Sequence, residues 1–290
     1  MELSIIVDFL FKGLEISAPI AFAALGAVFS EKSGVVNIAL EGFMATTTFT
    51  IVWGSIAFQS IWMGLLVAII TGIIMALIHA VATITYRVNQ IVSGVAINIL
   101  AIGIGRFLSQ RIFGQETQSA LNSYLFPTVF GINSFAFALI PITAVCWFVI
   151  YKTRFGLRLR TVGENPEAAD TLGINVYVMR YAGVILSGVM CGLAAAVLYP
   201  SKWINGMTAG RGFIALAAMI FGRWHPVGAV LAALLFGYAD TFRIMFETKI
   251  PIPSQFVQML PYVLAIVVLV GMMGKAKPPA ADGIPYEPGE

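Results

Sequence analysis

Long apolar runs, broken by short polar stretches, make up most of this chain. Runs of about 18 or more residues with few charges are typical of membrane-spanning helices. The sequence has five such runs, at positions 61–86, 88–105, 134–151, 181–200 and 255–274. They lack the strict alternation of apolar and polar residues that marks the strands of a membrane β-barrel. The pattern therefore predicts an all-α fold, a polytopic transmembrane helical bundle of about 8–10 helices.

Residues 212–222 form an apolar stretch that is too short to cross the membrane, and Gly-rich sequence flanks it on both sides. A half-helix or re-entrant segment of this kind is tolerated only where it is buried in protein or lines a cavity. The pentapeptides Glu-Gly-Phe-Met-Ala at 41–45 and Arg-Gly-Phe-Ile-Ala at 211–215 resemble each other. Together they are consistent with an inverted repeat, in which two related halves of a membrane protein run in opposite directions.

Small residues recur at helical spacing in two of the runs. The first set is Gly64, Ala68, Gly72, Ala76 and Ala80, and the second is Gly188, Gly192 and Ala196. Faces of this kind let neighbouring helices approach closely. We expect them to serve helix packing rather than ligand binding.

Composition agrees with a membrane protein and excludes an ordinary soluble domain. Hydrophobic residues make up 59% of the chain and charged residues 11%, against roughly 25% charged in soluble proteins. The net charge of +3 is too small to indicate a nucleic-acid-binding surface. Cys146 and Cys191 both lie within apolar runs, where a free thiol behaves as a small hydrophobic group, so they predict neither a disulfide nor a metal site.

The longest polar interruption, residues 152–180, sets the orientation of the chain. Basic residues begin and end this segment: Lys152, Arg154, Arg158, Arg160 and Arg180. Because loops on the cytoplasmic side carry an excess of Lys and Arg, we place this segment in the cytoplasm, and the polar connection 107–133 on the opposite side. We expect residues 1–275 to form the transmembrane domain. Residues 276–290, rich in Pro and Gly, should form a disordered cytoplasmic tail.

A short helix is predicted inside the cytoplasmic segment. Asn165 can cap its N-terminus, Pro166 suits the first helical position and Gly173 can end it in a left-handed conformation. Glu167 lies in the first turn, where the helix dipole favours negative charge. The remaining positions predict a small apolar face made of Ala168, Ala169 and Leu172. An exposed apolar face on a cytoplasmic helix indicates a partner.

The residues that could carry out chemistry do not form a catalytic pattern. A phosphate-binding Walker A sequence is absent, and His79 and His225 have no Cys or carboxylate at metal-ligand spacing. We expect His79 to be a packed polar residue in a helix. The sequence therefore predicts no catalytic residues, no metal and no cofactor, and we do not expect an enzyme.

Four segments carry a resemblance to a known family. Residues 167–173, Glu-Ala-Ala-Asp-Thr-Leu-Gly, resemble the EAA loop of binding-protein-dependent ABC importer permeases. Residues 31–44 are similar to a block in the smaller permease subunit of bacterial nucleoside importers, and 162–174 and 213–228 resemble the cytoplasmic loop and a late Gly-rich segment of the same superfamily. That superfamily also includes ribose and branched-chain amino acid permeases.

The resemblance implies a multi-pass permease of the bacterial inner membrane. It implies a cytoplasmic ABC ATPase that hydrolyses ATP and docks on the short helix, through Asn165, Pro166, Glu167, Ala168, Ala169, Leu172 and Gly173. It also implies a second, larger permease subunit, an extracytoplasmic substrate-binding lipoprotein, and contact with membrane lipid. The expected small-molecule substrate is a nucleoside, and a ribose-like sugar or a branched-chain amino acid is the alternative.

Polar residues within the apolar runs are candidates for the translocation pathway, since such residues are costly unless they face protein or water. The candidates are Asn37, Glu41 and Asn98. For Glu41, a buried packing role is an equal alternative, and for Asn98 a structural role is favoured.

A stand-alone secondary transporter or channel is a reading of a different class. It would explain the broken helices and Glu41 equally well, but it gives no reason for a capped apolar helix in the cytoplasmic segment. An intramembrane enzyme would need paired aspartates or a Ser/His arrangement, and the sequence has neither.

Overall fold

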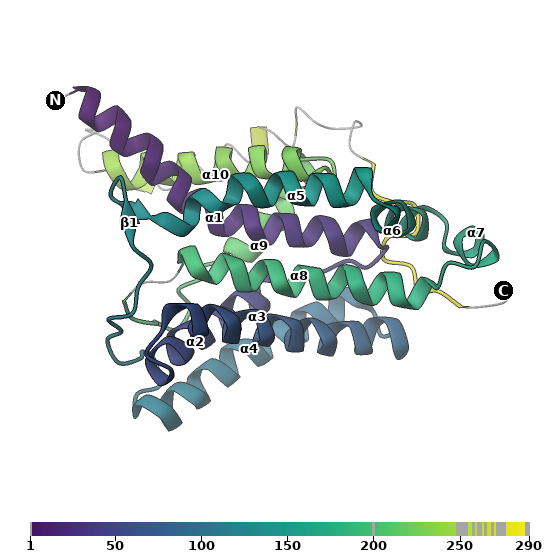
Figure 1. Cartoon of the computed structure of the whole chain (residues 1–290), viewed down its shortest axis with the longest axis horizontal. Helices are drawn as coiled ribbons and strands as arrows, with labels where there is room; N and C mark the ends of the chain where they lie inside the picture. Colours follow the sequence, from purple (N-terminus) through teal and green to yellow (C-terminus); the bar gives the residue numbers. More distant parts are fainter. Residues whose placement is uncertain are drawn as a thin grey trace.

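A computed structural model describes residues 2–198, 201–247 and 277–287, together with the isolated positions 255, 256, 259, 263, 266, 267 and 270. Helices dominate these residues and most of them lie along the long axis of the molecule, as Figure 1 shows. The only strands among the described residues are the short β1 (Thr128–Val129) and β2 (Ile132–Asn133), which pair antiparallel. The predicted all-α fold is confirmed.

The helices of the described residues follow one another along the chain, most of them with short connections. They are α1 (Glu2–Lys32), α2 (Leu40–Ala57), α3 (Ile61–Ala80) with the π-helical turn η1 (Val81–Thr85), α4 (Gln90–Phe113), the 3-10 turn η2 (Ser134–Ala138) with α5 (Leu139–Lys152), α6 (Arg154–Glu164), α7 (Pro166–Thr171), α8 (Val176–Leu198), α9 (Arg211–Phe221) and α10 (Pro226–Phe246). Within the described residues, five helical segments are long and apolar enough to span a membrane. Four of them overlap predicted runs, and the fifth predicted run, 255–274, falls mostly outside the described residues.

Helix α10 is a spanning segment that the apolar runs did not predict. Asp240 and Arg243 interrupt its sequence, but their side chains form an ion pair, with 2.7 Å between Arg243 Nη2 and Asp240 Oδ1. Pairing the two charges one helical turn apart lowers the cost of carrying them within an apolar helix. A search for runs with few charges treats each charge separately and so misses such a pair.

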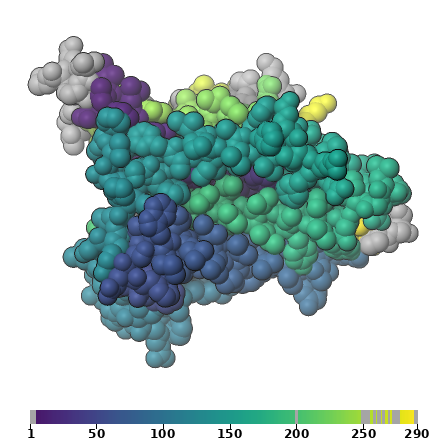
Figure 2. Space-filling model, in the orientation of Figure 1, coloured from purple at the N-terminus to yellow at the C-terminus, as the bar shows by residue number. Residues whose placement is uncertain are grey.

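Helices α1 and α8 form the centre of the bundle. Helix α1 packs against α8, α9 and α10, and α8 also packs against α3 on its other side. On the face shown in Figure 2, α1 is visible only at its N-terminal end and as a narrow strip between α5 and α8. The two small-residue faces pack against each other: a Cβ atom added at Gly188 would lie 2.1 Å from the carbonyl oxygen of Gly72. This agrees with the expected role of both faces in helix packing.

The two polar connections lie at opposite ends of the molecule. Figure 1 shows β1 and the chain before it at one end, and α6 and α7 at the other. This separation agrees with the predicted placement of residues 107–133 and 152–180 on opposite sides of the membrane. The last five residues of 152–180 already belong to α8.

The prediction of a disordered tail is wrong for residues 277–287. The Ala281 N–H donates to the carbonyl of Gly163 at 2.9 Å, and Tyr286 is 7% exposed. Pro and Gly lower the intrinsic tendency to form helices or strands, but they do not prevent an irregular segment from packing when its backbone groups find partners. Composition alone therefore misjudged this segment.

Candidate functional site

A cavity of about 300 Å³ lies at the N-terminal end of the half-helix α9. This volume is at the lower end of the range for small-molecule sites, roughly 300–1,000 Å³. Residues of α2, α4, α9 and the segment 203–210 line it. Much of the lining is aliphatic, and the polar and aromatic side chains are Glu41, Asn98, Trp203, Asn205, Thr208 and Phe213. Helix α9 has the 11 residues Arg211–Phe221, so the prediction of a half-helix is confirmed, and of the two settings expected for it, burial in protein or the edge of a cavity, its first residues border a cavity.

Glu41 connects the start of α2 to the start of α9. Its Oε1 accepts hydrogen bonds from Thr208 Oγ1 at 2.6 Å and from the Gly210 N–H at 3.0 Å, and its Oε2 accepts one from the Gly212 N–H at 2.7 Å. The first N–H groups of a helix lack partners within the helix, and the helix dipole favours a negative charge beside them. The carboxylate is therefore stabilised by α9 while its side chain lines the cavity.

Gly210 and Gly212 make this contact sterically feasible. Gly210 has a φ of 80°, the left-handed conformation that glycine adopts at low cost. A Cβ atom at Gly212 would lie 2.4 Å from the backbone nitrogen of Glu41. The glycines therefore allow α9 to begin directly against α2.

Asn98 lies beside Glu41 and holds the start of α2 in place. Its Oδ1 accepts a hydrogen bond from the Gly42 N–H at 2.7 Å, and its Nδ2 donates to the Ile38 carbonyl at 3.0 Å. Both ends of the amide are thus used by the backbone. This geometry agrees with the favoured structural role, although the side chain also lines the cavity.

Asn37, the third predicted pathway residue, lies outside this cavity. It is fully buried, its Nδ2 donates to Ser187 Oγ at 2.7 Å, and its Oδ1 accepts from the Ala39 N–H at 3.1 Å. The structure thus brings Glu41 and Asn98 together and leaves Asn37 between α8 and the chain before α2.

The sequence reasoning missed the cavity residues of segment 203–210. Trp203, Asn205 and Thr208 precede the half-helix, and the Gly-rich sequence there was the available signal. Residues that precede a broken helix are well placed to line the cavity that this helix borders.

The predicted helix of the cytoplasmic segment is present as α7. The Asn165 Oδ1 accepts a hydrogen bond from the Ala168 N–H at 2.9 Å, Pro166 is the first helical residue, and Gly173 has a φ of 76°. The Ile174 N–H donates to the Ala169 carbonyl at 3.0 Å, which closes the end of the helix. The predicted start and stop signals are confirmed.

The predicted apolar face of α7 is wrong in part, because its residues point in different directions. Ala169 is fully buried and packs with Val162, Val176 and Tyr286. Ala168 is exposed, and Leu172 is 75% exposed. Neighbouring residues on a helix lie about 100° apart, so Ala168 and Ala169 do not share one face. The surface open to a partner therefore contains Ala168 and Leu172, with the exposed Glu167 beside them.

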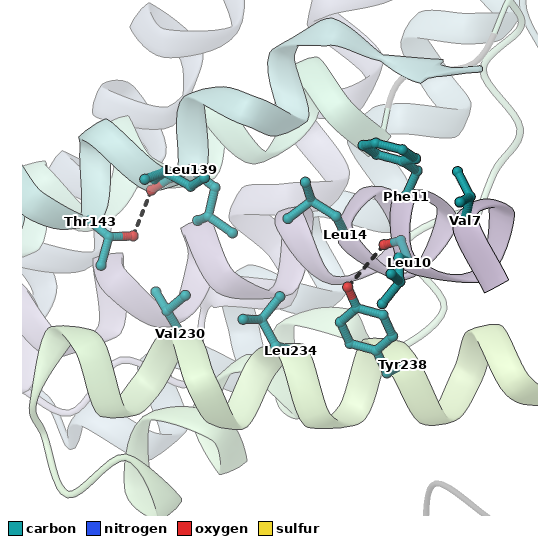
Figure 3. A pocket seen from close by; sticks show the side chains of 10 residues that line it. Val7, Leu10, Phe11, Leu14, Leu139, Thr143, Val230, Leu234 and Tyr238 are labelled. Atoms are coloured by element: carbon teal, nitrogen blue, oxygen red, sulfur yellow. Dashed lines mark hydrogen bonds between the residues drawn. The ribbon is translucent and has the colours of Figure 1, made fainter. Parts of the chain in front are cut away.

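A larger groove of about 660 Å³ lies between α1, α5 and α10, as Figure 3 shows. Its lining is apolar apart from Thr143 and Tyr238, whose hydroxyls donate to the carbonyls of Leu139 at 2.6 Å and Leu10 at 2.9 Å. Among the described residues that line it, none is charged. A polar solute would find few partners there, so we do not take this groove as the functional site.

His79 is the packed polar residue that the sequence predicted. It is fully buried, with its ring nitrogens 3.0 Å from Ser93 Oγ and 3.2 Å from the Val36 carbonyl oxygen. Within the described part of the chain, no three His, Cys, Asp or Glu side chains come together as a metal site would require.

Comparison with known proteins assigns the family. The family model described as "Branched-chain amino acid transport system / permease component" matches residues 9–272. The guanosine ABC transporter permease protein NupQ of Bacillus subtilis is 42% identical, over 94% of this chain and 94% of that protein. The nucleoside ABC transporter permease protein NupC of Lactococcus lactis is also 42% identical, over 93% of each chain.

A third relative is named for a different solute. The putative glucose ABC transporter permease protein TsgC13 of Haloferax volcanii is 32% identical, over 78% of this chain and 74% of that protein. The family match covers the bundle, the half-helix α9 and the cytoplasmic helix α7. The chain therefore belongs to the branched-chain amino acid transport system permease family, and it is a multi-pass membrane permease subunit of an ABC transporter.

Proposed function

We propose that this permease subunit carries nucleosides into the cell, and that the cavity at α9 lies on their path. Two relatives named for guanosine or nucleosides, both 42% identical, support this substrate class. The observation that carries the proposal for the cavity is the bonding of Glu41, whose oxygens are occupied by Thr208 and by the start of α9. A carboxylate whose oxygens are already occupied by these donors has little capacity left to bind a cation, so the cavity suits a neutral polar solute.

The rest of the lining fits a nucleoside in particular. Phe213 is 49% exposed and borders the cavity, where its ring can stack on a base. Asn205 and Thr208 offer an amide and a hydroxyl to sugar or base groups. A simple sugar is the second candidate, supported by the relative TsgC13. A sugar lacks the flat base, so the contribution of Phe213 distinguishes the two.

We expect Phe213→Ala to raise the KM for guanosine uptake by about tenfold, because stacking on an aromatic ring contributes about 1–3 kcal/mol per base. Uptake of labelled guanosine by cells that depend on this transporter measures the effect, with uridine, ribose and leucine as competitors. Phe148→Ala on α5, where the ring is 56% exposed outside the cavity, is the matched control. Competition by ribose or leucine but not by uridine would contradict the nucleoside assignment.

The exposed surface of α7 is the proposed docking site for a cytoplasmic ABC ATPase. Helix α7 is capped and lies at one end of the molecule (Figure 1), and the Leu172 side chain at its C-terminal end is 75% exposed. We also propose a second, larger permease subunit, so that the complex is a heterodimer in the membrane, and a substrate-binding lipoprotein on the opposite side. Within the described part of the chain, the spanning segments Gln90–Phe113 and Ser134–Lys152 have few fully buried residues, which leaves area for such a subunit and for lipid.

Leu172→Glu is expected to reduce recovery of the ATPase with a tagged permease at least tenfold. A charge on an apolar contact must lose its hydration without gaining a partner. Purification in mild detergent, followed by quantification of the ATPase, measures the loss. Leu121→Glu is the control, because Leu121 is also 75% exposed but lies in the connection at the other end. An undiminished yield of ATPase with Leu172→Glu would refute docking at this residue.

A further inference from the structure

The C-terminal segment 280–287 packs where the cytoplasmic segment meets the membrane helices. It appears as the yellow trace beside α6 in Figure 1. Besides the Ala281 bond to Gly163 at the end of α6, the Gly283 N–H donates to the Gly34 carbonyl at 3.3 Å. Gly34 follows α1. Two alternate residues of the segment thus bond to two separate parts of the fold.

Two charged side chains, Arg180 on α8 and Glu287 in the segment, strengthen this attachment. Arg180, in the first turns of α8 and 1% exposed, donates from Nη1 to the Ile284 carbonyl at 2.9 Å. Glu287 forms an ion pair with Arg87, which follows η1. Within the described part of the chain, Nε and Nη2 of Arg180 have no hydrogen-bond partner. The Ile284 carbonyl therefore supplies a hydrogen bond that this buried guanidinium strongly requires.

Tyr286 joins the segment to the docking helix. Its ring is buried beneath α7, where it packs with Ala169 and Val176 and lies 5.9 Å from the ring of Tyr177. Helix α7 has only six residues, and a helix this short has little stability of its own. Its position therefore depends on what packs under it, and Tyr286 is one of the side chains that do so.

Asp282 connects the segment to α1, and through α1 to the turn between α9 and α10. Its carboxyl faces that of Glu31, and the Trp224 Nε1–H donates to Glu31 Oε2 at 2.6 Å. Burial raises the pKa of Asp282 to about 7, against the opposing effect of Arg180. Trp224 has a φ of 54°, a strained conformation that this contact helps to hold.

We propose that residues 280–287 form a strap that transmits the movement of the docked ATPase from α7 to the transport helices. The strap contacts α7 through Tyr286 and α8 through Ile284. Through Asp282 it also faces Glu31 of α1, and Glu31 in turn binds Trp224 in the turn after α9. The other end of α9 binds Glu41 at the cavity. Packed side chains pass on a displacement because they have little free volume in which to absorb it. Without the strap, a displaced α7 would shift relative to the bundle and the transport helices would stay in place.

This inference rests on the proposed function, since it assumes an ATPase on α7. Tyr286 and Asp282 act as positioning residues, because neither touches the solute or the nucleotide. Their removal should therefore leave the ATPase bound and active while transport is lost. A residue that only stabilised the fold would change the amount of complex but not the ratio of ATP hydrolysed to solute transported.

The test uses the complete transporter in proteoliposomes. Tyr286→Ala is expected to retain the ATPase on purification, lower uptake at least tenfold, and raise the ATP hydrolysed per solute by a similar factor. Tyr286→Phe keeps the ring and should stay within about threefold of the wild type. Ile284→Ala is the matched control, because that side chain is 55% exposed and its carbonyl still reaches Arg180.

A second variant keeps the proposal testable if Tyr286→Ala does not fold. Ala281→Pro removes the N–H that bonds to Gly163 and leaves the Tyr286 side chain in place, and we expect it to raise the same ratio at least threefold. A wild-type ratio for Tyr286→Ala, or for Ala281→Pro when Tyr286→Ala does not fold, would overturn the strap. If the wild-type permease itself recovers no ATPase, the proposed function fails instead, so the two failures are distinguishable.

Discussion

Gly188→Ala is expected to destabilise the bundle strongly, although alanine is the better helix former. The Cβ atom added at Gly188 would lie 2.1 Å from the carbonyl oxygen of Gly72, and one added at Gly72 would lie 2.2 Å from the carbonyl oxygen of Gly188. The backbones of α3 and α8 therefore touch directly. A methyl group can fit only if the two helices move apart, which would open voids along a contact that runs through the bundle. We expect a loss of about 3 kcal/mol or more in the free energy of unfolding.

Gly103→Ala on α4 is the matched control for this change. Among the described residues, no atom would lie within 4 Å of a Cβ at Gly103, so only helix propensity acts, and it favours alanine by roughly 1 kcal/mol. Thermal denaturation in detergent, followed by size-exclusion chromatography, should show the two variants shifting in opposite directions. Equal melting temperatures for the two would contradict the close contact.

The sequence predicted those helices whose start, end and apolar character are set by residues close together along the chain. Asn165, Pro166 and Gly173 act within one short helix, so their order along the chain was sufficient to define α7. The apolar runs predicted the spanning helices for the same reason. The search for apolar runs missed α10, because Asp240 and Arg243 interrupt its sequence although they pair with each other in the structure.

Contacts between distant parts of the chain were not predictable in the same way. Glu41 binds residues about 170 positions later, and nothing near Glu41 in the sequence indicates that partner. Asn37 and Asn98 looked alike as polar residues in apolar surroundings, yet only Asn98 borders the cavity. The packed tail depends on Gly163 and Gly34, so its composition could not reveal it. Residue type thus identified candidates, while their positions depended on tertiary contacts.

Glu41→Ala is expected to lower solute uptake at least a hundredfold. The change removes the acceptor for Thr208 Oγ1 and for the N–H groups of Gly210 and Gly212. Hydrogen bonds to a charged group contribute about 1.5–3 kcal/mol each, so the contact between α2 and the start of α9 should lose several kcal/mol of stabilising free energy. Glu41→Gln keeps one acceptor oxygen but turns an NH₂ group toward N–H donors, and we expect an intermediate loss. Glu116→Gln, an exposed change in the connection at the other end, is the control.

The pattern across solutes distinguishes a support for α9 from a direct solute contact. If Glu41 mainly holds α9, Glu41→Gln should lower the melting temperature of the purified permease. It should also lower the maximal uptake rate, by the same factor for purine and pyrimidine nucleosides. If Glu41 instead binds the solute, the variant should keep its melting temperature and change KM differently for different bases. The three bonds to the start of α9 favour the first result. A normal melting temperature with base-dependent KM values would assign Glu41 to the solute and leave α9 held by its packing against α1 and α10.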